Sequence, residues 1–183
     1  MNKKLIETLK HGGVAVIPTD TIYGLVASAL DPMAVERVYE LKGRSPDKPC
    51  IVLISDVADL EKFGVLIDKE NSPLLKTLWP GPVSIIFPTA PQFKRSLAYL
   101  HRGTETLAFR LPKLKSLRDL VRATGPLIAP SANPEGEKPA TSVTMAKRYF
   151  SDRVDAYVSS VKKPSKPSKL VALQAGKIIV IRV

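Results

Sequence analysis

Three cations lie close together in the segment KGRSPDKP, which runs from Lys42 to Pro49. Prolines at positions 46 and 49 restrict its backbone, so we expect Lys42, Arg44 and Lys48 on one shaped loop. Like charges held this close repel one another unless an anion lies between them. An arginine fork with two lysine point charges suits a polyphosphate. The alternative is the solvated carboxyl end of a helix, where cations are also favourable.

The apolar run Val14–Ile17 leads into the polar sequence PTDTIYG. Apolar residues without alternation predict a strand that is covered on both faces, and Pro18 interrupts its pairing. Thr19 to Gly24 then lie at the carboxyl end of a central strand, which is where open α/β sheets bind ligands. An ordinary strand-to-loop connection is the alternative.

A second polar pair, Ser131 and Asn133, follows the apolar run Leu127–Ala129. Residues two apart point the same way only where the chain is extended. There, a hydroxyl and an amide can bind a phosphate, a ribose or a carboxylate. An Asx turn before Pro134 is the alternative.

Several common catalytic patterns are absent from the sequence. It has no GxxxxGK[ST] and no GxGxxG after a strand, which argues against a P-loop enzyme and a dinucleotide-binding fold. His11 and His101 are isolated, lack the spacing of metal ligands and are expected at the surface. The single cysteine, Cys50, opens an apolar stretch and is expected in the core.

Hydrophobic periodicity predicts helices that alternate with strands and a late hairpin. We therefore expect one α/β domain over residues 1–183, with a twisted mixed sheet flanked by helices. Helices are expected over Leu5–Leu9, Pro32–Leu41, Val57–Phe63, Ser72–Leu78, Ser116–Ala123 and Val143–Phe150. Strands are expected over Val14–Ile17, Cys50–Ile54, Val83–Phe87, Thr106–Leu111, Leu127–Ala129, Val154–Val158, Leu170–Leu173 and Lys177–Ile181, with an irregular basic segment between Phe87 and Thr106.

The formal net charge of +11 favours anionic partners, such as nucleoside triphosphates or nucleic acid. Part of this charge lies in KKPSKPSK, Lys162 to Lys169, which predicts a stiff, exposed loop. No apolar run reaches the length of a membrane span, no signal-peptide pattern is present, and one cysteine excludes an internal disulfide. The expectation is a cytoplasmic protein without a membrane partner.

Seven stretches of the chain together resemble the YrdC-like family, and specifically the L-threonylcarbamoyladenylate synthases that begin the t6A modification of tRNA. They occur in family order and cover nearly the whole chain. The stretches are PTDTIYGL, KGR with DKP, WPGPVSIIF, LAFRLP, APSAN, GEKPATS and PSKLVAL. The resemblance implies the YrdC-like fold and an enzyme that forms threonylcarbamoyl-AMP and pyrophosphate from L-threonine, bicarbonate and ATP. Such a reaction depends on positioning and on charge stabilisation, without a covalent nucleophile.

The resemblance also implies two sets of binding residues. The ATP set is Lys42, Arg44, Lys48, Thr106, Asn133, Thr141 and Arg182, with Lys42 and Arg44 as the catalytic clamp on the triphosphate. The threonine set is Thr21, Arg110, Ser131 and Ser168, with Arg110 on the carboxylate. No resident metal is implied, and Mg²⁺ is carried with ATP. The implied partners are the t6A transferase machinery and tRNA.

The sequence departs from the family pattern at Lys169, where threonine is usual, and at Ala172, where aspartate is usual. Both changes concern the threonine pocket and leave the ATP clamp intact. Two other functions stay open: a relative that forms a carbamoyl-adenylate, and a basic module that binds double-stranded RNA or tRNA.

Overall fold

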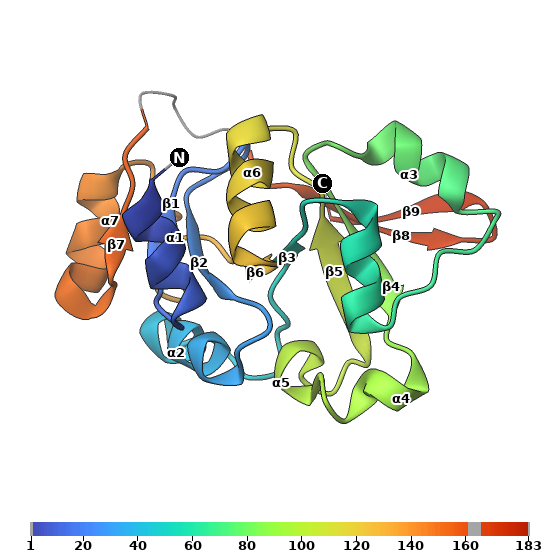
Figure 1. The fold of residues 1–183 in the computed structure, drawn as a ribbon, viewed down its shortest axis with the longest axis horizontal. Helices are drawn as coiled ribbons and strands as arrows, with labels where there is room; N and C mark the ends of the chain where they lie inside the picture. The colour runs from blue at the N-terminus through green and yellow to red at the C-terminus, as the bar shows by residue number, and fades with distance from the viewer. Residues whose placement is uncertain (1, 161–165, 183) are drawn as a thin grey trace.

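The computed structural model describes residues 2–160 and 166–182, and within them a nine-stranded mixed sheet spans the molecule (Figure 1). Its strand order is β7-β1-β2-β6-β3-β5-β4-β8-β9. The pairs β1 with β7, β3 with β5 and β4 with β8 are parallel, and the other neighbours are antiparallel. The strands are β1 Ala15–Ile17, β2 Gly24–Ser28, β3 Val52–Leu53, β4 Val83–Pro88, β5 Thr106–Arg110, β6 Leu127–Ile128, β7 Ala156–Tyr157, β8 Lys169–Gln174 and β9 Lys177–Arg182. The predicted α/β fold with a mixed sheet is confirmed.

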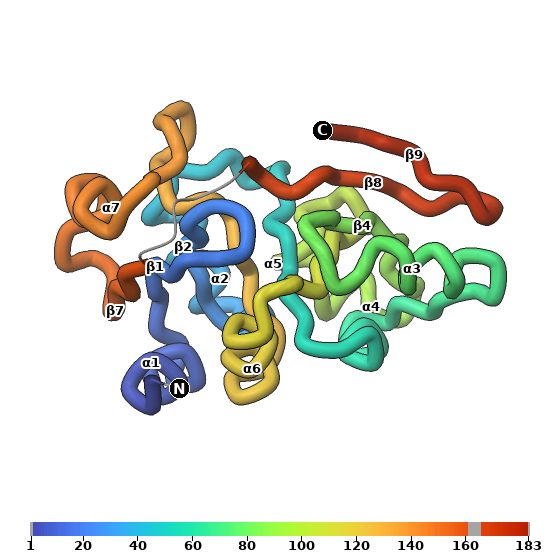
Figure 2. Tube along the Cα trace, turned by 90° about the horizontal axis from the view of Figure 1, so that it is seen from above, coloured from blue at the N-terminus to red at the C-terminus, as the bar shows by residue number. Residues whose placement is uncertain are grey.

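Helices cover both faces of this sheet. The α-helices are α1 Lys3–Lys10, α2 Pro32–Lys42, α3 Ser72–Leu78, α4 Pro91–Lys94, α5 Ala98–His101, α6 Lys115–Thr124 and α7 Val143–Phe150. Two 3₁₀ helices, η1 Val57–Phe63 and η2 Ser151–Arg153, complete the described elements. Helices α1 and α6 contact each other and lie on the same side of the molecule (Figure 2).

The central strands are buried on both faces, as their unbroken apolar runs predict. In β1, Val16 belongs to the larger apolar cluster, whereas its neighbours Ala15 and Ile17 belong to the smaller one. Side chains of α1 and α6 complete the smaller cluster, and those of α2, η1, α5 and α7 complete the larger one. The sheet is thus fixed between two apolar layers, and the strand ends remain as the place for polar groups.

The sequence analysis did not predict strand β2, Gly24–Ser28, which pairs with β1 through the turn that contains PTDTIY. Its small residues, such as Ala27 and Ser28, carry little strand propensity, and long-range pairing with β1 and β6 supplies the stability instead. The segment expected to be irregular before β5 contains the short helices α4 and α5. The helix expected over Val57–Phe63 is a 3₁₀ helix, whose first turn is closed by a capping box from Asp56.

The expectation for one histidine was wrong. His101 is buried, because α5 turns it inward, where its Nε2 donates to the Lys94 carbonyl at 2.7 Å and its Nδ1 accepts from the Gly103 N–H at 3.1 Å. His11 is exposed and Cys50 is buried, as predicted. Part of the predicted exposed loop, residues 162–165, lies outside the described residues.

No helix within residues 2–160 and 166–182 has both the length and the apolar character that a membrane crossing requires.

Two leucines near η1 provide a matched test of the larger cluster. Leu60 is 1% exposed and Leu66 is 84% exposed. We expect Leu60→Ala to lower the free energy of unfolding by about 2–5 kcal/mol, because it removes buried methyl groups and leaves a cavity. Leu66→Ala should change it by less than about 0.5 kcal/mol. Urea unfolding measures both free energies, and equal losses of stability in the two variants would contradict the burial of Leu60 in the larger apolar cluster.

Candidate functional site

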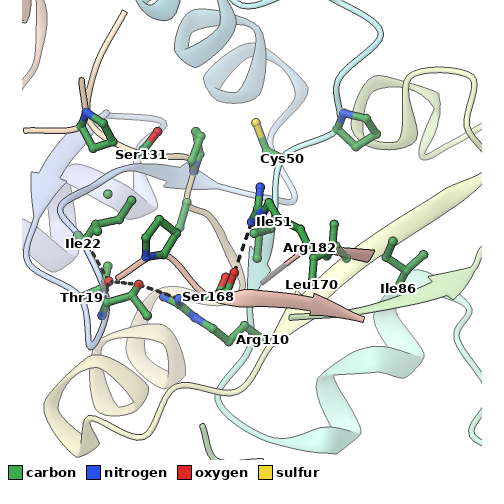
Figure 3. A pocket seen from close by; sticks show the side chains of 18 of the residues that line it. Thr19, Ile22, Cys50, Ile51, Ile86, Arg110, Ser131, Ser168, Leu170 and Arg182 are labelled. Atoms are coloured by element: carbon green, nitrogen blue, oxygen red, sulfur yellow. Dashed lines mark hydrogen bonds between the residues drawn. The ribbon is translucent and has the colours of Figure 1, made fainter. Parts of the chain in front are cut away.

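A cavity of about 400 Å³ opens where the ends of several strands meet (Figure 3). Its walls come from the β1–β2 turn, the segment before β3, strands β4 and β5, the segment after β6, and strands β8 and β9. The residues predicted for ligand binding that line it are Thr21, Arg44, Thr106, Arg110, Ser131, Ser168 and Arg182. Residues distant in sequence thus meet in one cavity.

Arg110, at the end of β5, is held by a chain of hydrogen bonds that runs into the β1–β2 turn (Figure 3). Its Nη1 donates to Thr21 Oγ1 at 2.7 Å. The hydroxyl groups of Thr21 and Thr19 form a hydrogen bond with 2.9 Å between their Oγ1 atoms. Thr19 Oγ1 donates to the Ile22 carbonyl at 2.7 Å, so the proton between the two threonines belongs to Thr21. The guanidinium therefore has a fixed orientation before any ligand binds.

Asp20 is the counter-ion of this buried arginine. Its Oδ1 lies 3.3 Å from Arg110 Nη2, and its Oδ2 accepts from the Lys113 N–H at 2.9 Å. Both side chains are at most 9% exposed. Burial lowers the pKa of Arg110, and the charge of Asp20 opposes that shift. Asp20 thus balances the positive charge of a guanidinium that has little contact with water.

Ser168 also lines the cavity and is fixed from two sides (Figure 3). Its Oγ is 2.9 Å from Ser84 Oγ on β4, and its carbonyl accepts from Arg182 Nη2 at 3.3 Å. These contacts join the β8–β9 hairpin to the rest of the site.

The cationic loop begins where α2 ends, because Gly43 takes the left-handed conformation at φ 57°. Arg44 folds back along this loop, with its Nε donating to the Lys48 carbonyl at 2.9 Å and its Nη2 to the Pro49 carbonyl at 3.1 Å. These bonds preorganise Arg44 in the cavity wall.

Lys42 does not line the cavity; the residue is only 3% exposed and lies behind the loop that follows β6. Its Nζ donates to the Ser131 carbonyl at 2.6 Å and to the Asn133 carbonyl at 2.5 Å. Burial, and then Arg44, lower the pKa of Lys42 to about 8, so the ammonium still predominates at neutral pH. In this structure the lysine fastens α2 to the segment that carries Ser131.

Lys48 also contacts the loop that follows β6, where it forms an ion pair with Glu135. The other oxygen of that carboxylate accepts from the Ser45 N–H at 2.5 Å. Lys48 lies outside the cavity lining, although its neighbour Pro49 is part of it.

Two further predicted residues lie outside the lining. Asn133 turns its amide to the Pro134 and Glu137 carbonyls, each at 2.8 Å, and leaves its buried Oδ1 without a hydrogen-bond partner in the described structure. Thr141 is exposed and contacts Met145 Sδ at 3.9 Å. Their roles, like those of Lys42 and Lys48, stay predictions.

The site also contains residues that the sequence analysis did not assign. Thr104 and Thr19 line the cavity, Asp20 pairs with Arg110 in its wall, and Glu135 pairs with Lys48 beside it. Thr19 and Asp20 stand in PTDT, so the polarity of that motif was a usable signal. No local sequence pattern indicated a role for Glu135, because its partners Ser45 and Lys48 lie about ninety residues earlier in the chain.

The part of the chain that the structure describes contains no group of three or more His, Cys, Asp or Glu side chains arranged to hold a metal ion. Cys50 lines the cavity, but burial raises the pKa of its thiol, which disfavours the thiolate that a nucleophile needs. The arrangement instead offers oriented cations and hydroxyls, which suit binding and charge stabilisation of a multiply anionic ligand.

Comparison with known proteins gives a consistent match. The Sua5/YciO/YrdC family model, described as "Telomere recombination", matches residues 7–183. A threonylcarbamoyl-AMP synthase of Pyrococcus abyssi is 33% identical over 151 residues, which cover 82% of this chain and 44% of that protein. A putative threonylcarbamoyl-AMP synthase of Methanocaldococcus jannaschii is 32% identical over 185 residues, which cover 98% of this chain and 86% of that protein. The crystal structure of P. abyssi Sua5 complexed with L-threonine superposes with a TM-score of 0.87 at 28% identity, and the match covers 98% of this chain and 52% of that one. The chain thus spans about half the length of the P. abyssi proteins it matches.

Replacing Asp20 tests the buried pair. We expect Asp20→Asn to lower the free energy of unfolding by roughly 3 kcal/mol, because it leaves a buried guanidinium without its counter-ion. Asp152→Asn, at an exposed position, is the matched control and should leave the midpoint of the unfolding transition unchanged. Chemical denaturation compares the two, and equal midpoints would contradict the assigned role of Asp20.

Proposed function

Since the chain belongs to the Sua5/YciO/YrdC family, we propose that it is an L-threonylcarbamoyladenylate synthase that uses L-threonine, bicarbonate and ATP. In this reaction the threonine nitrogen forms a bond to the bicarbonate carbon with loss of water. The resulting carbamate oxygen forms a bond to the α-phosphorus of ATP, and the bond to pyrophosphate breaks. The enzyme is then a nucleotidyltransferase, and its product feeds the t6A transferase machinery that acts on tRNA.

One observation carries this proposal: preorganised Arg110 and Arg44, from distant parts of the chain, line the same cavity as Ser131 and Ser168. Arg110 suits the carboxylate of an amino acid, because it is positively charged and its orientation is fixed by Asp20 and Thr21. The threonine-bound relative supports an amino-acid site in this fold.

The residues around Arg44 suit the nucleotide part of the reaction. Arg44 would contact phosphate oxygens, and Arg182 and Thr106 supply a cation and a hydroxyl in the same cavity. Mg²⁺ would arrive bound to the phosphates, where it neutralises charge. The protein then acts by holding a carbamate oxygen in line with the α-phosphorus while cations stabilise the departing pyrophosphate.

The direct test is pyrophosphate release from ATP, measured with threonine and bicarbonate added separately and together. We expect release only when both are present. Equal release without threonine would indicate a carbamoyl-adenylate activity. No release, with binding of double-stranded RNA or tRNA, would indicate the binding module instead.

The same assay tests whether Arg110 binds the carboxylate of threonine. We expect Arg110→Gln to raise the KM for threonine about 10- to 100-fold, since it removes a charged, two-pronged contact, while the Kd for ATP stays near the wild-type value. Arg122→Gln, on the exposed side of α6, is the matched control and should change neither. A loss of ATP binding with an unchanged KM for threonine would place the arginine at the nucleotide.

A further inference from the structure

Glu135 joins the two loops that carry the cations and the polar residues of the site. Its Oε1 forms the ion pair with Lys48, and its Oε2 accepts from the Ser45 N–H at 2.5 Å. Its own N–H donates to the Lys42 carbonyl at 2.7 Å. The carboxylate therefore accepts hydrogen bonds from both the Lys48 ammonium and the Ser45 backbone N–H. Phosphate groups in proteins commonly accept from the same two kinds of donor.

This carboxylate is charged at neutral pH. Lys48, the Ser45 N–H and then Arg44 hold the pKa of Glu135 below its usual range. Glu135, together with Asp47 of the cationic loop itself, thus supplies negative charge beside Lys48 and Arg44.

The side chain is not needed to fasten the two loops to each other. The Glu135 backbone already bonds to Lys42, and the Lys42 ammonium bonds to the Ser131 and Asn133 carbonyls. The carboxylate is also 31% exposed and Lys48 is 54% exposed, so their pair can open at little cost.

The groups that Glu135 occupies lie at the rim of the cavity. Arg44, which precedes Ser45, and Pro49, which follows Lys48, both line it. Lys48 itself does not, so its ammonium has to leave Glu135 before it can contact a ligand phosphate in the cavity.

We propose that Glu135 is an internal competitor of nucleotide phosphates, which holds Lys48 and the Ser45 N–H in the free protein and lowers the affinity for ATP. This inference rests on the proposed function, because it takes ATP as the ligand. It assigns Glu135 a role opposite to that of a binding residue: its removal strengthens binding.

Isothermal titration of the full chain with Mg-ATP tests the proposal. We expect Glu135→Gln to lower the Kd about three- to tenfold, because the variant frees Lys48 and removes a negative charge beside the phosphates. Glu137→Gln is the matched control: it lies two residues on in the same loop, is exposed, and forms no ion pair within the described residues. It should change the Kd by less than about twofold.

A double-mutant cycle separates competition for Lys48 from a general effect of charge. In a Lys48→Gln background, Glu135→Gln should lose most of its effect, since there is no ammonium left to free. An unchanged or weaker affinity of Glu135→Gln, or an equal gain in Glu137→Gln, would overturn the proposal while wild-type binding of ATP remained. Failure of the wild-type chain to bind ATP would instead refute the proposed function.

Discussion

The buried ammonium of Lys42 is the contact on which the arrangement of the site depends. It reaches from the last residue of α2 to two carbonyls of the loop after β6, and so joins elements about ninety residues apart in the chain. A buried charge is tolerated only where hydrogen bonds replace its lost hydration, and two short bonds to carbonyls do so here. Without them, the cationic loop and the segment with Ser131 would share only backbone and exposed contacts.

The same principle governs the other cations around the cavity, because each is oriented by oxygen atoms of the protein before a ligand arrives. Arg44 bonds to carbonyls of its own loop, Arg182 to that of Ser168, and Arg110 to a carboxylate and a hydroxyl. Donors fixed in this way need little reorganisation when negative charge develops, which favours the transfer of a phosphate-linked group. Lys48 differs, since its partner is an exposed carboxylate that can release it.

Much of this architecture could be predicted from the sequence. Unbroken apolar runs indicated strands buried on both faces, and proline- and aspartate-capped segments indicated helices such as α2. Strand β2 could not be predicted, because pairing with β1 and β6, rather than local propensity, makes it a strand.

The polar motifs likewise indicated several of the residues that line the cavity, but not Lys42, Lys48, Asn133 and Thr141, which lie outside the lining, and not how each cation is held. The motif containing Lys42 shows three equivalent positive charges, whereas the structure buries one, lines the cavity with Arg44 and pairs Lys48 with Glu135. Those differences arise from contacts between the loop after α2 and the loop after β6. Such long-range contacts leave no local pattern in the sequence.

Hydrogen exchange on Lys42→Met tests the central role of this lysine most directly, with Lys48→Met as the matched control. Methionine keeps an unbranched side chain only one atom shorter than that of lysine and removes both bonds to the carbonyls. We predict roughly tenfold or faster exchange at the amides of Asn133, Glu135 and Ala140 in Lys42→Met, because each lost charged bond contributes about 1.5–3 kcal/mol. Lys48→Met should leave the Asn133 and Ala140 amides close to wild type. Equal exchange at these amides in wild type and Lys42→Met would contradict the account.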